Sequence, residues 1–388
     1  MKVAIIANGN GLNPSIGGSL KRTIEIAKRF RKMGHEVHFL TTIGGYKACQ
    51  SEKLNAYYYI FPASILKKEE RHIFDRILAY LISTMSFFLR LRNLPKCDVV
   101  CTDSDYFCDT LPAMMYKRIN NAQWVAISHH LISISWLNTR DFIVTFLSKA
   151  LQLFSFLLFK GYADKVLVYN SEAGDKIKNQ LTKIGIPHHK IFYVNNGVDI
   201  ELIDSIKPLN VKFDACFIGG LRPSKGLYDI VPIWEKVTLK IKAKLVVVGG
   251  GLPEYENYLK EQIKVKKLNN YILLVGAKSH EEAIKILKAS KIFFFPSHEE
   301  GWGIVICEAL ACKKPIVAYD LPVYKRPFGD SIFYVPRWNV TAFAEKVIEV
   351  LKQGNLDEIG EKNYNVALKY SWDRIAEEEL NIINKSNT

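Results

Sequence analysis

The chain has 388 residues, of which 48% are hydrophobic and 24% are charged. A length of this order predicts two domains, and the composition excludes a disordered chain, a collagen-like fibre and a small disulfide scaffold. Lys and Arg number 53 against 39 Asp and Glu, which gives a formal net charge of +14. This excess predicts an anionic partner such as a phosphorylated ligand, an acidic polymer, a nucleic acid or a membrane surface.

The N-terminal residues MKVAIIAN predict a strand and are too short for the apolar core of a secretion signal. The seven cysteines include no CxxC pair and no Cys/His cluster with zinc spacing, so we expect reduced thiols. The most apolar stretch, residues 142–159, is interrupted by Lys149 and Gln152. It predicts a buried or surface-lying helix rather than a membrane span. We therefore expect a cytoplasmic protein.

Short β-branched runs alternate with longer helical patterns along the chain, which is typical of βαβ units and a parallel sheet. These runs are mostly continuous and apolar, as expected for strands that helices cover on both faces. In the first half the predicted strands are residues 3–7, 37–41, 99–102, 124–128, 165–169 and 191–194. In the second half they are residues 215–218, 244–248, 271–275, 292–295, 315–318 and 332–335.

Residues 201–213 contain Pro208 and no strong pattern, so we place the domain joint there. The predicted fold is α/β, with two Rossmann-like doubly wound domains, residues 1–205 and 206–388, that face each other across a cleft. The last segment, from about residue 371, predicts a helix with Ser371 as its cap and Asp373 in its first turn. We expect this helix to pack back on the first domain.

Charge is unevenly shared between the halves. Residues 1–200 contain 26 basic and 15 acidic residues, a balance of +11, and residues 201–388 contain 27 and 24, a balance of +3. The basic excess therefore belongs to the first domain.

The most informative stretch is FFFPSHEEGWGIVICEALA, residues 293–311. It predicts a buried strand, a polar Gly-rich turn and a helix that begins near Gly303. Backbone N–H groups at such a helix start suit a phosphate, and open α/β sheets bind ligands at this edge. Glu300 in the turn and Glu308 on the helix could accept hydrogen bonds from the hydroxyls of a sugar or ribose. The alternative is two solvated glutamates near a helix start.

The pattern Glu300-Gly-Trp-Gly-x4-Glu308 resembles the E-x7-E signature of retaining GT-B glycosyltransferases of family 4, also called group 1. Other segments resemble motifs of that family in the expected order, and together they span nearly the whole chain. These segments are Gly17-Gly18, Ser128-His129-His130, VNNGVD at 194–199 and IGGLRPSKG at 218–226. The resemblance implies a GT-B fold with an N-terminal acceptor-binding domain and a C-terminal domain that binds the donor, a nucleotide diphosphate sugar.

The family's roles imply a catalytic set of Glu300, His129, Lys225 and Arg222. Glu300 would contact the hydroxyls of the donor sugar, Glu308 the ribose, and Lys225 the pyrophosphate. His130 is expected on the acceptor side. The implied donor-binding residues are Gly17, Gly18, Gly220, Gly249, Gly251, Ala277, Lys278, Gly301, Trp302, Gly303, Ile304, Val305 and Glu308, with residues 301–305 acting through their backbone.

Three of these assignments have structural alternatives. The family places an arginine where this chain has Gly220, so Arg222 either reaches the phosphates by another path or is a surface arginine. His129 follows a predicted strand and is either a cleft contact or a hydrogen-bonded structural histidine. Gly17 and Gly18 either allow a ligand to approach the backbone or form a plain loop.

The expected reaction is that of a hexosyltransferase, which moves a sugar from the donor to a hydroxyl of a glycan or lipid-linked acceptor with retention of configuration. A UDP- or GDP-sugar is the expected donor, with no cofactor. Asp103-Ser-Asp105 resembles the metal-binding D-x-D pair of another glycosyltransferase fold, but it lies far from the donor motifs in sequence. We treat it as a loop pair and predict no metal requirement.

Other functions remain open from the sequence. A nucleotide-sugar epimerase or a phosphorylase would have a similar architecture, and a non-enzymatic protein could bind polyanions through the basic surface. A Rossmann oxidoreductase is disfavoured because no G-x-G-x-x-G follows the first strand. Nucleic acid is not expected as a partner, since no helix-turn-helix, zinc or RRM pattern is present.

Two segments of the first domain, residues 65–94 and 132–159, combine apolar and basic residues. They favour a peripheral contact with an anionic membrane, at its inner face. The alternative is that both are cleft-lining helices with solvated basic faces. The basic residues of the first segment are Lys67, Lys68, Arg71, Arg76, Arg90 and Arg92.

Overall fold

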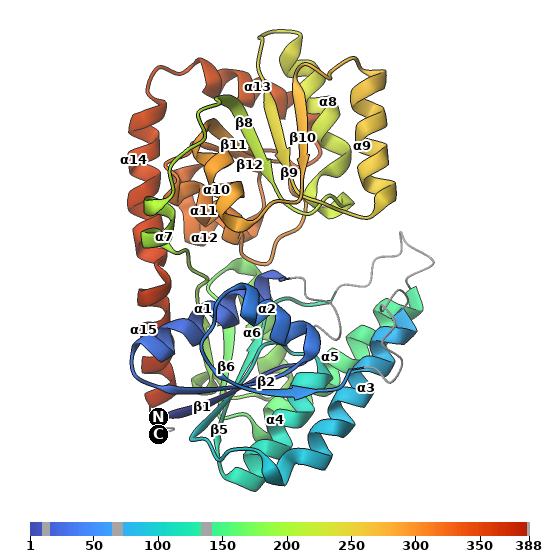
Figure 1. The fold of residues 1–388 in the computed structure, drawn as a ribbon, viewed down its shortest axis with the longest axis vertical. Coiled ribbons are helices and arrows are strands. Elements are labelled where there is room, and N and C mark those ends of the chain that lie inside the picture. The colour runs from blue at the N-terminus through green and yellow to red at the C-terminus, as the bar shows by residue number, and fades with distance from the viewer. Residues whose placement is uncertain (10–15, 64–72, 133–141, 386–388) are drawn as a thin grey trace. The chain divides into compact units, whose positions relative to one another are not determined.

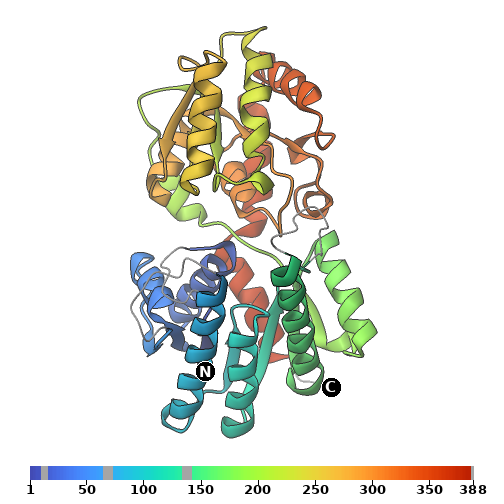
Figure 2. The same ribbon diagram turned by 90° about the vertical axis from the view of Figure 1, so that its right-hand side faces the viewer.

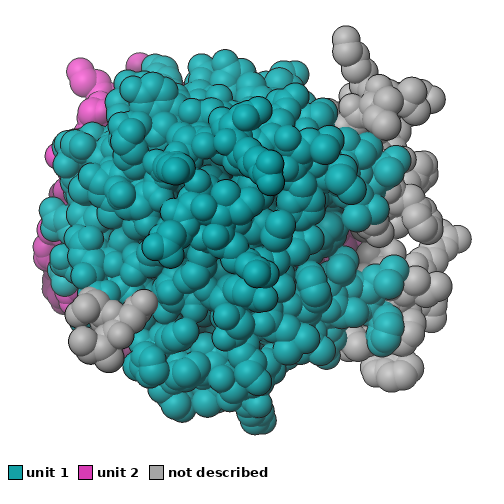
Figure 3. Space-filling model, turned by 90° about the horizontal axis from the view of Figure 1, so that it is seen from below, with its two compact units in different colours: residues 1–196, 372–388 teal, residues 197–371 magenta. Residues whose placement is uncertain are grey.

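The computed structural model describes residues 1–9, 16–63, 73–132 and 142–385. The chain divides into two compact units (Figure 3). Unit 1 comprises Met1–Asn196 together with Trp372–Thr388, and unit 2 comprises Gly197–Ser371. Each unit is built on its own parallel sheet (Figure 1). The predicted α/β class with two doubly wound sheets is therefore confirmed.

Unit 1 contains a seven-stranded sheet in the order β3-β2-β1-β4-β5-β6-β7, in which every pairing is parallel. The direction of winding reverses between β1 and β4, which makes the loops after these two strands the switch point of the sheet. The strands are β1 (Lys2–Ala7), β2 (Glu36–Thr42), β3 (Tyr57–Phe61), β4 (Val99–Thr102), β5 (Gln123–Ser128), β6 (Lys165–Tyr169) and β7 (Ile191–Val194).

Helices cover both faces of this sheet. On one face α3, α4, α5 and α6 follow one another, each packed against the next, over a core that includes Trp124 and Phe156. The C-terminal α15 packs against α1 and β7. The helices of unit 1 are α1 (Gly18–Lys32), α2 (Ile43–Ser51), α3 (Ile73–Arg90), α4 (Phe107–Asn120), α5 (Phe142–Tyr162), α6 (Glu172–Ile184) and α15 (Trp372–Asn384).

Unit 2 contains a six-stranded parallel sheet in the order β10-β9-β8-β11-β12-β13. Its switch point lies between β8 and β11, so the loops after these two strands are adjacent. The continuous burial of β9 and β12 agrees with their all-apolar sequences. The strands are β8 (Phe213–Ile218), β9 (Leu245–Val248), β10 (Ile272–Gly276), β11 (Ser290–Phe295), β12 (Ile316–Tyr319) and β13 (Ile332–Val335).

The helices of unit 2 also form two layers. α8 packs against α9 and α13, and α11 packs against α7 and α14. These helices are α7 (Ile200–Ser205), α8 (Leu227–Thr238), α9 (Pro253–Val265), α10 (His280–Lys288), α11 (Ile304–Ala311), α12 (Pro322–Phe328), α13 (Val340–Lys352) and α14 (Leu356–Ala367).

The division of the chain differs from the expected boundary at residues 205 and 206. α7 belongs to unit 2 because it packs on α11, and Lys288 Nζ donates to the carbonyl oxygens of Ile203 and Ile206, the latter at 2.8 Å. At the other end of the chain, α15 belongs to unit 1, where Glu379 forms a buried ion pair with Arg22 of α1. Unit 1 is therefore discontinuous in sequence.

The twelve predicted strands are all present, and one strand was missed. β3, with the sequence YYYIF, is the edge strand beside β2, and only its last residue, Phe61, is buried. Three basic residues of the expected membrane-facing segment, Lys67, Lys68 and Arg71, lie outside the described residues. Over the described ranges, no helix is both long enough and apolar enough to cross a membrane.

Candidate active site

Two loops meet at the switch point of unit 2. The loop after β8, residues 219–226, contains Lys225, and the loop after β11, residues 296–303, contains Glu300. The backbone N–H of His298 donates to Ser224 O at 2.9 Å, and that of Glu299 donates to the same oxygen at 3.2 Å. These bonds fix the two loops to each other.

The fixed loops bring Lys225 and Glu300 together in an ion pair. The two side chains are only 14% and 9% exposed, so water screens the pair little. The Lys225 ammonium also lies 5.8 Å from the centre of the Phe295 ring. An ammonium held in this way is well placed to receive an anion at the edge of the sheet.

α11 begins directly after the Glu300 turn. Its N-cap, Gly303, has φ 100°, which an L side chain rarely adopts, and a Cβ there would lie 3.1 Å from Tyr324. The free N–H groups of the first turn and the helix dipole favour an anionic ligand at this end. Trp302 is buried, with its ring against Phe328 and Tyr370, so its side chain belongs to the core.

Glu308 lies one turn further along α11 and is 14% exposed. Its Oε1 is 2.8 Å from Nε2 of His280, the first residue of α10. Ser279, the N-cap of α10, forms a capping box with Glu282 and so fixes the start of the helix that carries His280. His280 belongs to none of the predicted site residues, and the only sequence signal for it is its position after the capping serine.

The glycine turns after β8 and β9 are packed backbone to backbone. A Cβ on Gly249 would lie 1.8 Å from the carbonyl oxygen of Gly219, and Gly249 has φ 149°. Leu221 N donates to Gly250 O at 2.9 Å. Around this tight contact, Gly220, Gly251, Ala277 and Lys278 are all exposed, so the turns present backbone at the edge of the sheet.

Arg222 lies in the same loop as Lys225, but its side chain is exposed. In the part of the chain that the structure describes, it forms no ion pair. The structure thus brings Lys225, Glu300, the start of α11 and Glu308 to one edge, with Arg222 at the periphery of this group.

The Glu300 loop is also held by a group of residues outside the predicted site, His298, Asp229 and Tyr319. His298 Nε2 lies 2.8 Å from Asp229 Oδ2, and the Tyr319 hydroxyl donates to the same oxygen at 2.7 Å. The His298 ring stacks on Trp338 at 3.5 Å, and burial lowers the pKa of His298. These contacts fasten the loop to α8 and β12.

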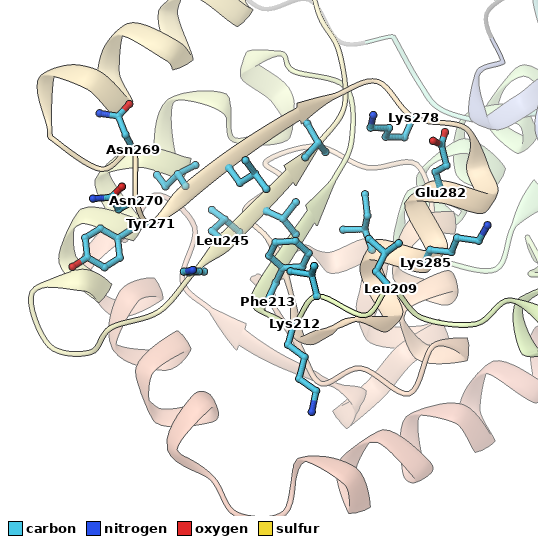
Figure 4. A pocket seen from close by; sticks show the side chains of 17 residues that line it. Leu209, Lys212, Phe213, Leu245, Asn269, Asn270, Tyr271, Lys278, Glu282 and Lys285 are labelled. Carbon is cyan, nitrogen blue, oxygen red and sulfur yellow. The ribbon is translucent and has the colours of Figure 1, made fainter.

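A groove of about 570 Å³ lies elsewhere on unit 2, beside the edge strand β10 (Figure 4). Its wall is mainly apolar and comes from the segment before β8, from β9 and β10, and from α10; Leu245, Ile272 and Leu273 contribute to it. Lys278 is the only predicted donor-binding residue among those that line the groove. The groove is therefore distinct from the group at the switch point.

In unit 1, His129 follows β5 and is buried. Its Nε2 lies 2.6 Å from the carbonyl oxygen of Asp103, and its Nδ1 lies 2.7 Å from the Tyr169 hydroxyl. The carbonyl can only accept, so Nε2 carries the proton and Nδ1 accepts from Tyr169. Burial lowers the pKa of His129 to about 3, which keeps the ring neutral. Its neighbour His130 is exposed.

The carboxylates near His129 are also buried and hydrogen-bonded. Thr23 Oγ1 donates to Asp103 at 2.5 Å, Ser128 Oγ to Asp105 at 2.6 Å, and Ser104 Oγ to Asp109 at 2.5 Å. Burial raises the pKa of Asp103 to about 6 and that of Asp109 well above its ordinary value. The Asp103-Ser-Asp105 pair thus belongs to an internal hydrogen-bond network.

Gly17 and Gly18 are exposed where α1 begins, with Gly17 as the N-cap. A Cβ built on Gly17 meets no atom of the described residues within 4 Å, and its φ of −78° suits any residue. Packing against the described residues of unit 1 therefore does not explain a glycine at position 17.

Comparison with known proteins gives two family matches. The profile of Glycosyltransferase Family 4 matches residues 16–202, and that of Glycosyl transferases group 1 matches residues 199–365. Together they span most of the chain, and they meet near the boundary between the two units.

The chain is 23% identical to the N-acetyl-alpha-D-glucosaminyl L-malate synthase of Bacillus anthracis, over 88% of this chain and 87% of that protein. It is 30% identical to a probable sucrose-phosphate synthase of Thermosipho melanesiensis, over 51% of this chain and 48% of the relative. Against several curated relatives the match spans about half of the relative's length. Among solved structures, Anabaena HepE in complex with UDP and glucose superposes with a TM-score of 0.75 at 17% identity, over 99% of both chains.

Proposed function

This chain belongs to the family 4, or group 1, glycosyltransferases, and on that premise we propose that it transfers a hexosyl group from a UDP- or GDP-sugar to an acceptor hydroxyl. UDP is favoured between the two, since HepE is a structural neighbour with UDP bound. The observation that carries the proposal is the meeting of Lys225, Glu300 and the start of α11 at one edge of unit 2.

The hard part of such a transfer is the departure of a diphosphate while positive charge builds at the anomeric carbon. In our proposal the diphosphate lies between the Lys225 ammonium and the first N–H groups of α11. Both are fixed before the ligand arrives, and preorganised charges of this kind commonly contribute more to catalysis than any other effect. Glu300 then exchanges part of its contact with Lys225 for the hydroxyls of the donor sugar.

Glu308 binds the hydroxyls of the nucleotide ribose in this scheme. His280 holds Oε1 of that carboxylate at 2.8 Å and leaves Oε2 for the ribose. The nucleotide lies against the exposed turns that contain Gly220, Gly251 and residues 277–278, because these turns allow a ligand to approach the main chain closely.

The transfer proceeds with retention of configuration. The acceptor oxygen attacks the anomeric carbon on the face from which the diphosphate leaves, the carbon–oxygen bond to the diphosphate breaks, and a phosphate oxygen takes the acceptor's proton. Unit 1 binds the acceptor, a glycan or a lipid-linked sugar, and we expect no metal requirement.

A thermal-shift panel of UDP-, GDP- and ADP-sugars tests the proposal, because a ligand that binds only the folded state raises the melting temperature. We expect one nucleotide class to stabilise the protein clearly. Glu308→Ala should reduce that shift, whereas Glu345→Ala, which removes an exposed carboxylate on α13, should leave it unchanged.

Absence of any shift across the panel would contradict a nucleotide-sugar donor. A shift that survives in both Glu308→Ala and Lys225→Ala would contradict the site. If the stabilising sugar is epimerised without an acceptor, or consumed only with inorganic phosphate, the enzyme is an epimerase or a phosphorylase instead.

A further inference from the structure

The exposed apolar residues of unit 1 are concentrated on three helices. Among its described residues, every exposed large aliphatic side chain lies on α3, α4 or α5. The large hydrophobic residues exposed elsewhere in the unit are tyrosines, namely Tyr57, Tyr106 and Tyr193. Tyrosine carries a polar hydroxyl, whereas the residues on the three helices have none except Tyr162. Exposed apolar surface gathered in this way marks an interaction site.

The spacing shows that these residues form stripes. On α3, Leu78, Leu81, Met85 and Leu89 are 56%, 54%, 60% and 80% exposed, and steps of three and four residues place them on one face of a helix. Phe146, Leu153 and Leu157 form an equivalent stripe on α5, at 56%, 45% and 52%. α4 packs against both helices, so the stripes belong to one layer (Figures 1 and 2). We call this layer the α3–α5 face.

Where the structure describes the side chains of these helices, the exposed charges are basic. Within residues 78–90, 107–120 and 146–162 the sole acidic residue is Asp109, which is buried. Arg90, Arg118, Lys149 and Lys160 are exposed on the same helices. Over these ranges the face is therefore apolar, and its exposed charges are basic.

This combination decides between two occupants. A second copy of the chain, docked through the same face, would bring arginines and lysines against one another, which is costly when the apolar contact desolvates them. An anionic lipid surface instead offers hydrocarbon to the leucines and phenylalanines and phosphate groups to the cations.

We propose that the α3–α5 face is the membrane-binding surface of this protein and that it lies in the interface of an anionic bilayer. The helices remain packed on the sheet of unit 1, so the side chains insert only to the depth of the stripes. The surface lies in unit 1, and lipid binding through it does not depend on the donor proposed for unit 2.

Vesicle flotation of the full chain tests the proposal, with phosphatidylcholine vesicles that contain or lack phosphatidylglycerol. We expect binding to the anionic vesicles, weakened by salt. Leu81→Glu combined with Leu153→Glu should lower binding by about tenfold or more, since each change places a charge where an apolar side chain inserts. Arg118→Gln combined with Lys149→Gln should lower it by roughly tenfold on anionic vesicles.

A matched control carries Leu239→Glu and Val265→Glu, two residues of unit 2 that are 77% and 64% exposed. It should bind vesicles as the parent does. All variants should keep the parent's melting temperature, which shows that they are folded. They should also keep the rise in melting temperature that the nucleotide sugar causes, which distinguishes a loss of lipid binding from a failure of the donor proposal.

Three outcomes would overturn the proposal. One is no binding to anionic vesicles at low salt, and another is equal binding by the parent and the Leu81→Glu, Leu153→Glu variant. The third is a dimer in sedimentation velocity that this variant dissociates, because the occupant of the face would then be a second copy.

Discussion

The two units share a parallel α/β architecture but use the switch-point edge of the sheet differently. Among the described residues of unit 1, this edge carries buried, hydrogen-bonded side chains, with His129 bonded to the Tyr169 hydroxyl and to the Asp103 carbonyl oxygen. In unit 2 the corresponding edge consists of glycine turns, a helix start and the charged groups Lys225, Glu300 and Glu308.

A shared fold therefore does not fix the chemistry at the edge of its sheet. Backbone turns and partly exposed charges leave donors and acceptors for a ligand. Buried side chains that hydrogen-bond to one another instead fix the positions of loops. Substitutions at this edge should therefore change ligand affinity in unit 2 and the free energy of unfolding in unit 1. The tight backbone contact between Gly249 and Gly219 in unit 2 is an exception, since a substitution there should lower stability.

That exception has the largest expected effect. Gly249→Ala places a Cβ 1.8 Å from the Gly219 carbonyl oxygen at φ 149°, so we expect a loss of about 3–5 kcal/mol in the free energy of unfolding. Urea unfolding measures it. Gly17→Ala is the matched control: no described atom lies within 4 Å of its Cβ, and because Gly17 is an N-cap we expect a loss of about 1 kcal/mol or less. Equal stability of the two variants would show that the backbone contact in unit 2 is loose.

Lys225→Ala should have the next largest effect, on affinity for the donor. Loss of a charge-assisted contact to a diphosphate costs about 1.5–3 kcal/mol, which weakens donor binding by roughly ten- to a hundredfold. Isothermal calorimetry with the stabilising nucleotide sugar measures this. Lys260→Ala, which removes an exposed lysine on α9, should bind as the parent does. If Lys225→Ala bound the donor with unchanged affinity, Lys225 would not be part of the donor site.

His129→Gln should act mainly on stability, through two effects. At neutral pH the loss of a buried hydrogen bond costs about 1–2 kcal/mol. In addition, burial lowers the pKa of His129 from 6.5 in the unfolded chain to about 3. Its contribution to stability is therefore complete above pH 6.5 and is lost as the pH falls from 6.5 through about 3.

The variant should consequently lose less stability than the parent over that pH window, as measured by urea unfolding at several pH values. Asp103, with its pKa raised to about 6, titrates in the opposite direction, but it does so in both proteins and so largely cancels from the comparison. His130→Gln, at the exposed neighbour, is the control. An unchanged pH dependence with weakened donor binding would make His129 a ligand contact instead.

Arg222→Ala should have the smallest effect. The side chain is exposed, and exposed charges contribute up to about 1 kcal/mol, so donor affinity should fall by about fivefold or less. Isothermal calorimetry with the same nucleotide sugar measures the donor affinity of this variant. A loss as large as that of Lys225→Ala would assign Arg222 to the phosphate site.

Local patterns predicted much of the architecture. The apolar runs located the twelve strands, and the Gly-rich turn after β11 located the start of α11. β3 was missed because a hydrophobic run as short as YYYIF does not distinguish a strand from a helical segment, and its pairing with β2 is a tertiary contact. The domain boundary was less accurate because α7 belongs to unit 2 through its contact with α11, which lies a hundred residues further along the chain.

The sequence by itself determined the order of strands and helices, the glycines of the turns and the two glutamates on either side of a helix start, since each depends on neighbours in the chain. Only the tertiary structure decided which side chains meet. Lys225 reaches Glu300 across 75 positions and His280 reaches Glu308 across 28, because sheet order and loop packing bring distant segments together. The same packing buried His129 and left the apolar stripes of α3 and α5 exposed.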